Sequence, residues 1–327
     1  MKALVYRMGG LGDSLLIYPV LEILTKKGYE VTVWGNPEYF RIAEKTGFCK
    51  KATFYKPKEE FALKIIFSQN REICGTPKSH RVFGDPWGTP KGTRLFGDLL
   101  SSDSSIYINP VPEEQIWIVE YYLKELGLQN EKFSKTLPLA LQPSVIQGSK
   151  KPCGLFKVQG LKFKVQDSKL CIVHPGSGSK KKNPDLSFFF KLEQILKDYG
   201  FEILYLLGPA EVELIKIFKN SIYIEEPLEI AKTLIKANLY IGLDSGVSHL
   251  SSYLGIPSIV IFGPTNPEIW HPIGESYKII HYEGCKACFP STCEDRRCLN
   301  PDFLLSKLCK YIKKLEISET QIMSMEN

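Results

Sequence analysis

Residues 2–21 read KALVYRMGGLGDSLLIYPVL, a short apolar strand that runs into a glycine-rich turn and then into a helix. Residues 170–192, LCIVHPGSGSKKKNPDLSFFFKL, repeat this order of elements in the second half of the chain. The N–H groups of such turns and the positive end of the following helix attract anions. The two copies therefore predict two nucleotide-type α/β halves that handle a phosphorylated ligand.

The second half continues with short apolar segments that alternate with helical ones. Strands are expected at 201–207, 239–243 and 258–262, with a helix from about 211 and another over 246–254. Apolar strands that alternate with helices favour parallel, doubly wound sheets, which bind ligands beyond the carboxyl ends of their strands. The sequence therefore predicts an α/β fold whose functional loops gather at one edge of each sheet.

Local signals predict the helix boundaries. In the first half, a strand is expected at 30–34, and apolar spacing predicts a helix over 14–27 with a kink at Pro19. In the second half, Asn183 is the expected N-cap of a helix that has Pro184 at its first position.

The length of 327 residues is enough for two domains of ordinary size. The expected division is an N-terminal Rossmann-like domain over 1–165, a C-terminal Rossmann-like domain over 166–300, and a terminal helix and tail over 301–327. Residues 302–315 predict an amphipathic basic helix. We expect this helix to pack on its own domain or back on the N-terminal one, and contact with a membrane surface is the second alternative.

The bulk composition is that of a globular protein, with 43% hydrophobic and 24% charged residues. The formal net charge of +6 favours anionic partners such as phosphates or an acidic membrane surface, while the scattered basic residues form no nucleic-acid motif. No stretch approaches the roughly 20 apolar residues that span a bilayer, and the polar residues within 7–13 argue against a signal peptide. We therefore expect a cytoplasmic protein whose nine cysteines are thiols or metal ligands rather than disulfides.

The first turn, GGLGD (9–13), differs from two familiar nucleotide motifs. It lacks the G-x-G-x-x-G spacing of a dinucleotide fingerprint, and no Walker lysine follows it. Dehydrogenases and P-loop NTPases are therefore excluded. Asp13, at the start of the following helix, is either its N-cap or a general base that faces the cleft.

The second and third loops carry further candidate ligands. Hydroxyl and ammonium groups in the second turn suit a pyrophosphate, and a solvated basic loop is the alternative. On the helix over 246–254, Ser248, His249 and Ser252 lie away from the apolar stripe. A ligand-facing role for this histidine is therefore favoured over an idle surface position. The candidates of the two loops are Ser177, Ser179, Lys181, Lys182, Asp244, Ser245, Gly246 and His249.

Four cysteines lie close together before the terminal helix: Cys285, Cys288, Cys293 and Cys298. Four thiolates can hold a structural zinc ion, but this spacing differs from the paired C-x2-C of zinc ribbons. A reduced, metal-free cluster is the alternative.

Together these segments resemble glycosyltransferase family 9, the ADP-heptose:lipopolysaccharide heptosyltransferases, over most of the chain. The resemblance is carried by GGLGDSLLIYPVL (9–21), HPGSGSKKKNP (174–184) and IGLDSGVSHLSSYLGIPSIVIFGPTNP (241–267). The four cysteines also recur in many members. The resemblance implies GT-B architecture, with two Rossmann-like, doubly wound parallel-sheet domains that face a central cleft, the first for the acceptor and the second for the donor.

The resemblance also implies roles for single residues. Asp13 matches the base that deprotonates the acceptor hydroxyl, and Glu211 matches an acidic residue on the nucleotide side. Residues 244–249 match the donor loop, with Ser245 where the family usually has threonine. The tryptophan usually found before Pro184 is absent, so Lys181 and Lys182 compete for the single phosphate-binding position. Arg7 matches a basic position near the acceptor, and Arg81 and Arg94 are further candidates for binding acceptor phosphates.

The implied function is inverting, metal-independent transfer of heptose or a related sugar from a nucleotide-diphosphate donor, with ADP-heptose favoured, to a lipopolysaccharide core. No cofactor is required. The implied partners are the nucleotide-sugar, an anionic glycolipid acceptor and the cytoplasmic surface of the inner membrane, where the protein is expected to be peripheral; nucleic acid is not expected. The alternatives are a nucleotide-sugar epimerase or hydrolase on the same scaffold, and a non-catalytic sugar-nucleotide-binding protein.

Overall fold

The computed structural model describes residues 1–69, 105–140, 169–291 and 293–325, the last of these as backbone alone from residue 314. Its contacts divide the chain into two compact units. Unit 1 comprises Met1–Ala140, Glu226–Leu228 and Glu268–Ile273, and unit 2 contains the rest. The expected domain boundary near residue 165 lies outside the described residues.

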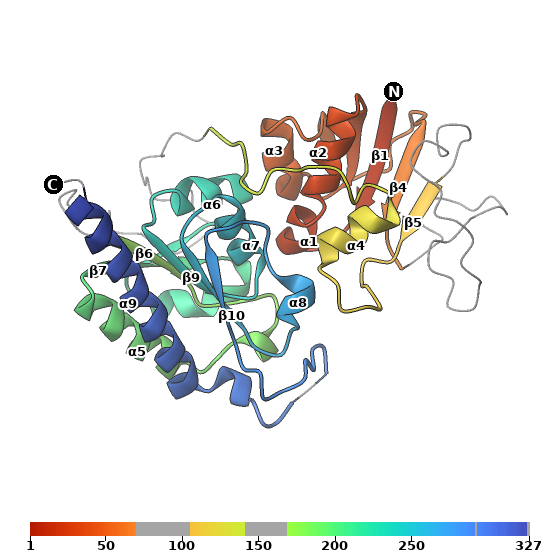
Figure 1. The fold of residues 1–327 in the computed structure, drawn as a ribbon. Helices are drawn as coiled ribbons and strands as arrows, with labels where there is room; N and C mark the ends of the chain where they lie inside the picture. Colours follow the sequence, from red (N-terminus) through yellow and green to blue (C-terminus); the bar gives the residue numbers. More distant parts are fainter. Residues whose placement is uncertain (70–104, 141–168, 292, 326–327) are drawn as a thin grey trace. The chain divides into compact units, whose positions relative to one another are not determined.

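Unit 1 is built on a parallel sheet of five strands in the order β3-β2-β1-β4-β5 (Figure 1). The strands are β1 (Lys2–Arg7), β2 (Glu30–Gly35), β3 (Lys51–Thr53), β4 (Leu63–Phe67) and β5 (Ser105–Ile108). The helices are α1 (Leu11–Leu15), α2 (Tyr18–Lys26), α3 (Pro37–Lys45) and α4 (Ile118–Glu125). Since the strands are parallel, the loops that follow them meet at one edge of the sheet.

Unit 2 contains a second parallel sheet, with six strands in the order β11-β10-β9-β6-β7-β8. The strands are β6 (Lys169–His174), β7 (Phe201–Leu207), β8 (Ser221–Tyr223), β9 (Leu239–Leu243), β10 (Ser258–Phe262) and β11 (Tyr277–His281). The helices and 3-10 turns are η3 (Lys180–Lys182), α5 (Leu186–Asp198), η4 (Pro209–Lys216), α6 (Pro227–Leu234), α7 (Gly246–Tyr253), η5 (Arg297–Leu299) and α9 (Pro301–Met325). The first two residues of α6 are counted with unit 1, as is the short helix α8 (Pro267–Trp270) from Glu268 onward. The predicted parallel α/β fold is thus confirmed for both units.

Two predicted helix boundaries are wrong, and a proline is involved in each. The single helix expected over 14–27 is two helices, because Pro19 lacks an N–H group and stands in the first turn of α2, where none is needed. The helix expected to begin at Pro184 begins at Leu186, with Asp185 as its N-cap. Asn183 instead accepts a hydrogen bond from Ser177, so its side chain is not available as a cap.

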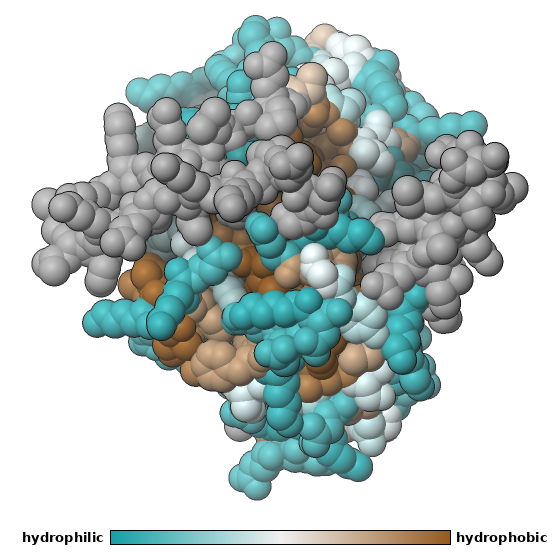
Figure 2. All heavy atoms as spheres, turned by 90° about the vertical axis from the view of Figure 1, so that its left-hand side faces the viewer, coloured by the Kyte–Doolittle hydropathy of each residue, from teal (hydrophilic) through white to brown (hydrophobic). Residues whose placement is uncertain are grey.

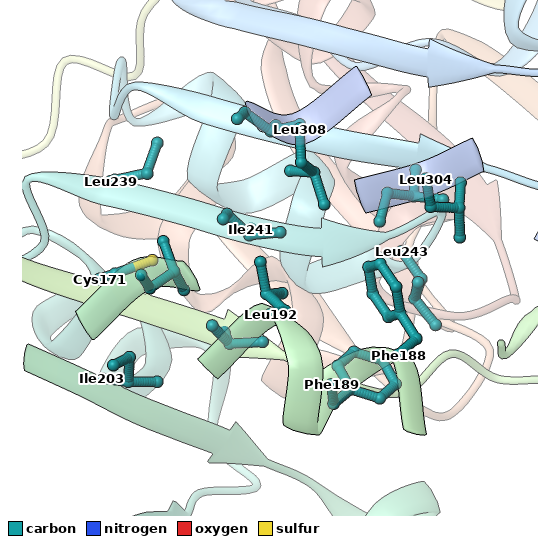
Figure 3. Close-up of a cluster of buried hydrophobic side chains, with 14 of the residues drawn as sticks. Cys171, Phe188, Phe189, Leu192, Ile203, Leu239, Ile241, Leu243, Leu304 and Leu308 are labelled. Carbon is teal, nitrogen blue, oxygen red and sulfur yellow. The ribbon is translucent and has the colours of Figure 1, made fainter. Parts of the chain in front are cut away.

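The core of unit 2 explains where the terminal helix packs. Side chains of α5 and α9 lie together over β6, β7 and β9, and Figure 3 shows Leu304 and Leu308 of α9 beside Leu192, Ile241 and Leu243. The described side chains of α9 that face inward thus belong to unit 2, while Lys307 and Lys310 are exposed. No helix in the described ranges is both apolar enough and long enough to cross a bilayer.

This packing predicts the effect of shortening one side chain of α9. Replacing Leu308, which is fully buried, with alanine is expected to lower the free energy of unfolding of unit 2 by about 3 kcal/mol, because burial is lost and a cavity remains. Denaturant unfolding followed by circular dichroism measures this loss. The neighbouring exposed Lys307→Ala is the control and is expected to stay within about 0.5 kcal/mol of the parent. Equal stabilities of the two variants would contradict the packing of α9.

Candidate functional site

The second glycine-rich loop follows β6 in unit 2 and is held by its own serines. The Ser177 hydroxyl donates to the carbonyl of Ser179 over 2.9 Å and to Asn183 Oδ1 over 2.8 Å. The Ser179 side chain is the N-cap of η3 and accepts from the Lys181 N–H. Both predicted ligands therefore shape the loop that presents the lysines.

The structure separates the two lysines that sequence alone leaves equivalent. Lys182 Nζ lies 2.7 Å from Asp244 Oδ2, and the side chains of this pair are only 17% and 7% exposed. The same ammonium group lies 4.7 Å from the centre of the Phe289 ring, a cation–π contact. Lys181 Nζ instead donates to the Pro290 carbonyl over 2.8 Å. Lys182 is thus the lysine that joins the third loop.

Asp244 is the centre of the site in unit 2. Its Oδ2 accepts hydrogen bonds from Lys182 and from the Thr265 hydroxyl, the latter over 2.6 Å, and its Oδ1 lies 4.0 Å from His249 Nε2. Asp244 follows β9 and Thr265 follows β10, and these strands are parallel neighbours. Thr265 was not among the predicted site residues, although it lies within the quoted segment 241–267. Its pairing with Asp244 depends on the adjacency of the two strands.

Helix α7 is more buried than its sequence pattern indicates. Ser245 is its N-cap and accepts from the Ser248 N–H, and Gly246 is its first residue. His249 is only 6% exposed, and Ser248 and Ser252 are fully buried. The polar side of this helix is thus inside the unit rather than on its surface, with the histidine beside Asp244.

Glu211 lies in a second polar cluster, next to the second glycine-rich loop. Its carboxylate is buried, and Oε2 accepts from the Gly208 N–H over 3.0 Å. A β-carbon on Gly176 would stand 1.9 Å from Glu211 Oε1, so only glycine permits this approach. His174 lies buried at the end of β6, with Nδ1 2.7 Å from the Leu206 carbonyl, and burial lowers its pKa.

In unit 1, Asp13 is held at both carboxylate oxygens. Oδ1 lies 2.5 Å from an Arg7 nitrogen, and Oδ2 accepts from the Gly10 N–H over 2.9 Å. Gly10 rather than Asp13 is the N-cap of α1, and Asp13 is the third helical residue. The Asp13 side chain remains 39% exposed, while that of Arg7 is 6% exposed. Asp13 can therefore meet a solvent-borne group, and Arg7 is buried behind it.

The remaining acceptor-side candidates, Arg81 and Arg94, lie outside the described residues. The structure therefore brings Arg7 together with Asp13 and adds no position for the other two arginines.

The four cysteines surround a small cavity of about 280 Å³, which Pro264, Arg296 and Arg297 also line. The structure records them as free cysteines. Hydrogen bonds from backbone N–H groups lower the pKa of the Cys293 thiol, and burial raises that of Cys298 to about 11. Within the described ranges no three His, Cys, Asp or Glu side chains are grouped as metal ligands.

This cysteine loop is bonded to the lysine loop. Besides the Lys181 bond to Pro290, an Arg296 guanidinium nitrogen donates to the Asn183 carbonyl. The N–H groups of Cys288 and Phe289 both donate to Pro264, directly before Thr265. The loop that contains the cysteines therefore buttresses the Lys182–Asp244–Thr265 group.

Comparison with known proteins identifies the family of the chain. Residues 125–298 match the sequence model of glycosyltransferase family 9 (heptosyltransferase). The chain belongs to glycosyltransferase family 9, and the resemblance noted in the sequence is confirmed.

One curated relative is lipopolysaccharide heptosyltransferase 1 of Pseudomonas aeruginosa, which is 34% identical over 76 residues. This match covers 20% of the chain and 21% of that protein. A family 9 glycosyltransferase from Veillonella parvula has a similar fold with a TM-score of 0.61 at 14% identity, covering 96% of this chain and 97% of that one. Heptosyltransferase WaaC of E. coli with ADP gives a TM-score of 0.58 at 13% identity, covering 95% and 100%. These likenesses confirm the GT-B fold class.

Proposed function

We propose that the protein transfers heptose, or a related sugar, from a nucleotide-diphosphate donor to the core of a lipopolysaccharide. Membership of a heptosyltransferase family supports this reaction class. ADP-heptose is the favoured donor, since WaaC was solved with ADP. The observation that carries the proposal is the buried Lys182–Asp244–Thr265 group beside the second glycine-rich loop, a fixed cation at an edge where parallel sheets bind nucleotides.

The donor diphosphate would be held by unit 2. Lys182 supplies a positive charge that Asp244 and Phe289 keep in one position. Ser245 and Gly246 place the N-terminus of α7 in the same loop, and its N–H groups add positive potential. Preorganised charges of this kind stabilise the negative charge that grows on a leaving diphosphate and can take the place of a metal ion. Glu211, beside the second glycine-rich loop at Gly176, would contact the nucleoside.

Asp13 would act as the general base. Its exposed carboxylate would take the proton of the acceptor hydroxyl while the acceptor oxygen attacks the anomeric carbon, and attack opposite the leaving diphosphate inverts that carbon. The Gly10 N–H and Arg7 hold the carboxylate in one orientation before the acceptor arrives. We therefore assign Arg7 to positioning the base rather than to binding acceptor phosphate.

The proposed reaction also suggests the acceptor and the location of the enzyme in the cell. The Pseudomonas aeruginosa relative is a lipopolysaccharide heptosyltransferase, and an acceptor of that kind is an anionic glycolipid. An enzyme that joins an intracellular nucleotide-sugar to such a lipid would work at the cytoplasmic surface of the inner membrane as a peripheral protein.

Thermal unfolding with ADP-, UDP-, GDP- and dTDP-sugars tests the donor, because a ligand that binds the native state raises the melting temperature. We expect the largest rise with ADP-heptose. Mass analysis of the products, with and without acceptor, tests the reaction. A transferase turns over slowly on donor alone, whereas an epimerase or hydrolase would consume donor at the same rate without acceptor, and a binding protein would consume none.

The close approach of Gly176 to Glu211 predicts a selective loss of donor binding. Gly176→Ala is expected to weaken ADP affinity about tenfold, because the new methyl group must displace the Glu211 carboxylate. Isothermal titration with ADP measures the change. Gly178→Ala is the matched control, since a β-carbon there meets nothing within 4 Å. Equal affinities of the two variants would contradict a nucleotide-side role for Glu211.

A further inference from the structure

An aromatic–basic loop, residues 54–58, follows β3 at the edge of the unit 1 sheet. Residues 50–60 read KKATFYKPKEE, with four lysines and two glutamates around two consecutive aromatic residues. Phe54 is 57% exposed and Tyr55 is 81% exposed. No other two consecutive aromatic side chains in the described part of the chain are exposed to this extent. An aromatic pair in this position adds nothing to the core.

The outward position of the pair is built into the fold. The Trp34 indole N–H donates to the Phe54 carbonyl over 3.1 Å, and the Tyr55 N–H donates to the Thr53 hydroxyl over 3.3 Å. The two aromatic rings lie edge to face, with centres 5.9 Å apart. Lys56 Nζ lies 5.9 Å from the centre of the Trp34 ring. Hydrogen bonds therefore fix the backbone of the loop and the Trp34 ring contacts Lys56, while both aromatic rings are exposed to solvent.

The charged residues around the loop indicate which kind of surface the loop can bind. Lys50 pairs with Glu30, and Lys51 pairs with Glu59, so these charges are balanced locally. Lys56 and Lys58 are exposed beside the aromatic pair. Tyrosine and phenylalanine side by side with lysine are typical of the interface between lipid headgroups and acyl chains, and each lysine strengthens binding to anionic lipid about fivefold.

A second exposed apolar region, on unit 2, has a different charge pattern. Phe190 is 50% exposed and lines a hollow of about 660 Å³. That hollow also contains Glu193, Glu202, Lys197 and Lys219, so its charges balance. Figure 2 shows the molecule from the left-hand side of Figure 1, where hydrophobic surface lies between hydrophilic side chains. Nothing there favours an anionic partner.

We propose that the loop 54–58 docks the protein on a membrane surface that contains anionic lipid. The inference extends the proposed function, which places a lipid-borne acceptor at such a surface. β3 and β1 are parallel and separated only by β2, so the docking loop and the Asp13 loop lie at the same edge of the unit 1 sheet, about 10 Å apart across the strands. A membrane at the docking loop brings the acceptor hydroxyl to the side of the sheet on which Asp13 lies.

Sedimentation of the full-length protein with lipid vesicles tests the inference. Wild-type protein is expected to bind vesicles of phosphatidylglycerol and phosphatidylethanolamine, and to bind phosphatidylcholine vesicles at least tenfold more weakly. The double variant F54S/Y55S is expected to lose at least tenfold of its binding to the anionic vesicles. K56E/K58E is expected to lose a similar factor, and added salt is expected to weaken the wild type more than this variant.

Matched control variants show which part of the protein contacts the membrane. F190S and the α9 variant K307E/K310E are expected to bind vesicles as the wild type does. Loss of binding in K307E/K310E together with normal binding in F54S/Y55S would overturn the proposal and place the membrane contact on α9. Normal vesicle binding by F54S/Y55S, with a raised KM for a detergent-dispersed acceptor, would overturn it and assign the loop to the acceptor saccharide.

The outcome is independent of the catalytic proposal. Asp13→Asn is expected to bind vesicles normally while turnover is lost, and absence of vesicle binding by active wild-type protein would overturn only the docking inference. The melting temperature of each variant shows that the exposed substitutions leave the fold intact.

Discussion

Asp13→Asn is expected to lower kcat about a thousandfold while the affinity for donor stays within twofold of the wild type. General base catalysis typically contributes between about a hundredfold and ten-thousandfold. Asparagine has the same shape, so its carbonyl oxygen can still accept from the Gly10 N–H and α1 keeps its N-terminal hydrogen bond. What is removed is the ability to take a proton.

Steady-state kinetics with donor and acceptor, together with titration of ADP, separate the two quantities. Glu38→Gln is the control, because Glu38 is also an exposed acidic residue in the first turn of a unit 1 helix, on α3. Unchanged kcat in Asp13→Asn would refute the assignment of the base.

A substitution of Arg7 tests the role of the Asp13 carboxylate in a second way. Since Arg7 is buried and bonded to Asp13, Arg7→Lys is expected to keep the positive charge but lose the fixed geometry. We expect a kcat about tenfold lower and an unchanged acceptor KM. A raised KM with normal kcat would instead make Arg7 an acceptor ligand, as the family resemblance implied.

The strands could be predicted from sequence because a parallel sheet buries them on both faces. β7, β9 and β10 are mostly apolar, with Glu202 near the start of β7 as the charged exception, and their bounds agree with those expected. Helix starts were less predictable, since Asn183 and Asp185 are both good caps in isolation. The choice depends on the Ser177 hydroxyl, which bonds Asn183 across the turn.

In the candidate site too, some features could be predicted from the sequence and others could not. Asp13 and Asp244 could be selected because each follows a strand, where parallel sheets place their ligand-binding loops, whereas Glu211 was selected through the family resemblance. Their contacts required the structure. Thr265 reaches Asp244 only because β10 lies beside β9, and the two adjacent lysines differ only in the direction that the η3 turn gives them. Neither the contact of Thr265 with Asp244 nor the difference between the two lysines can be predicted from a periodic pattern in the sequence.

This difference between the two lysines predicts unequal effects. Lys182→Met is expected to weaken ADP binding about a hundredfold, since a hydrogen bond between charged groups contributes about 3 kcal/mol in a favourable site. Lys181→Met is expected to change affinity less than threefold, because its ammonium group donates to a backbone carbonyl outside the Lys182–Asp244–Thr265 group. Titration of ADP by calorimetry measures both, and equal losses would mean that neither lysine is a specific phosphate ligand.

Removal of Lys182 also takes from the buried Asp244 carboxylate the positive charge with which it pairs, and an unpaired buried charge destabilises a fold by about 3 kcal/mol. The fall in affinity could then reflect a damaged loop rather than a lost phosphate contact. The double variant Lys182→Met/Asp244→Asn separates these causes, because asparagine carries no charge to leave unpaired. We expect it to regain most of the lost stability in thermal unfolding while ADP affinity stays about a hundredfold weak. Recovery of affinity along with stability would show that Lys182 only neutralises Asp244 and does not bind the donor.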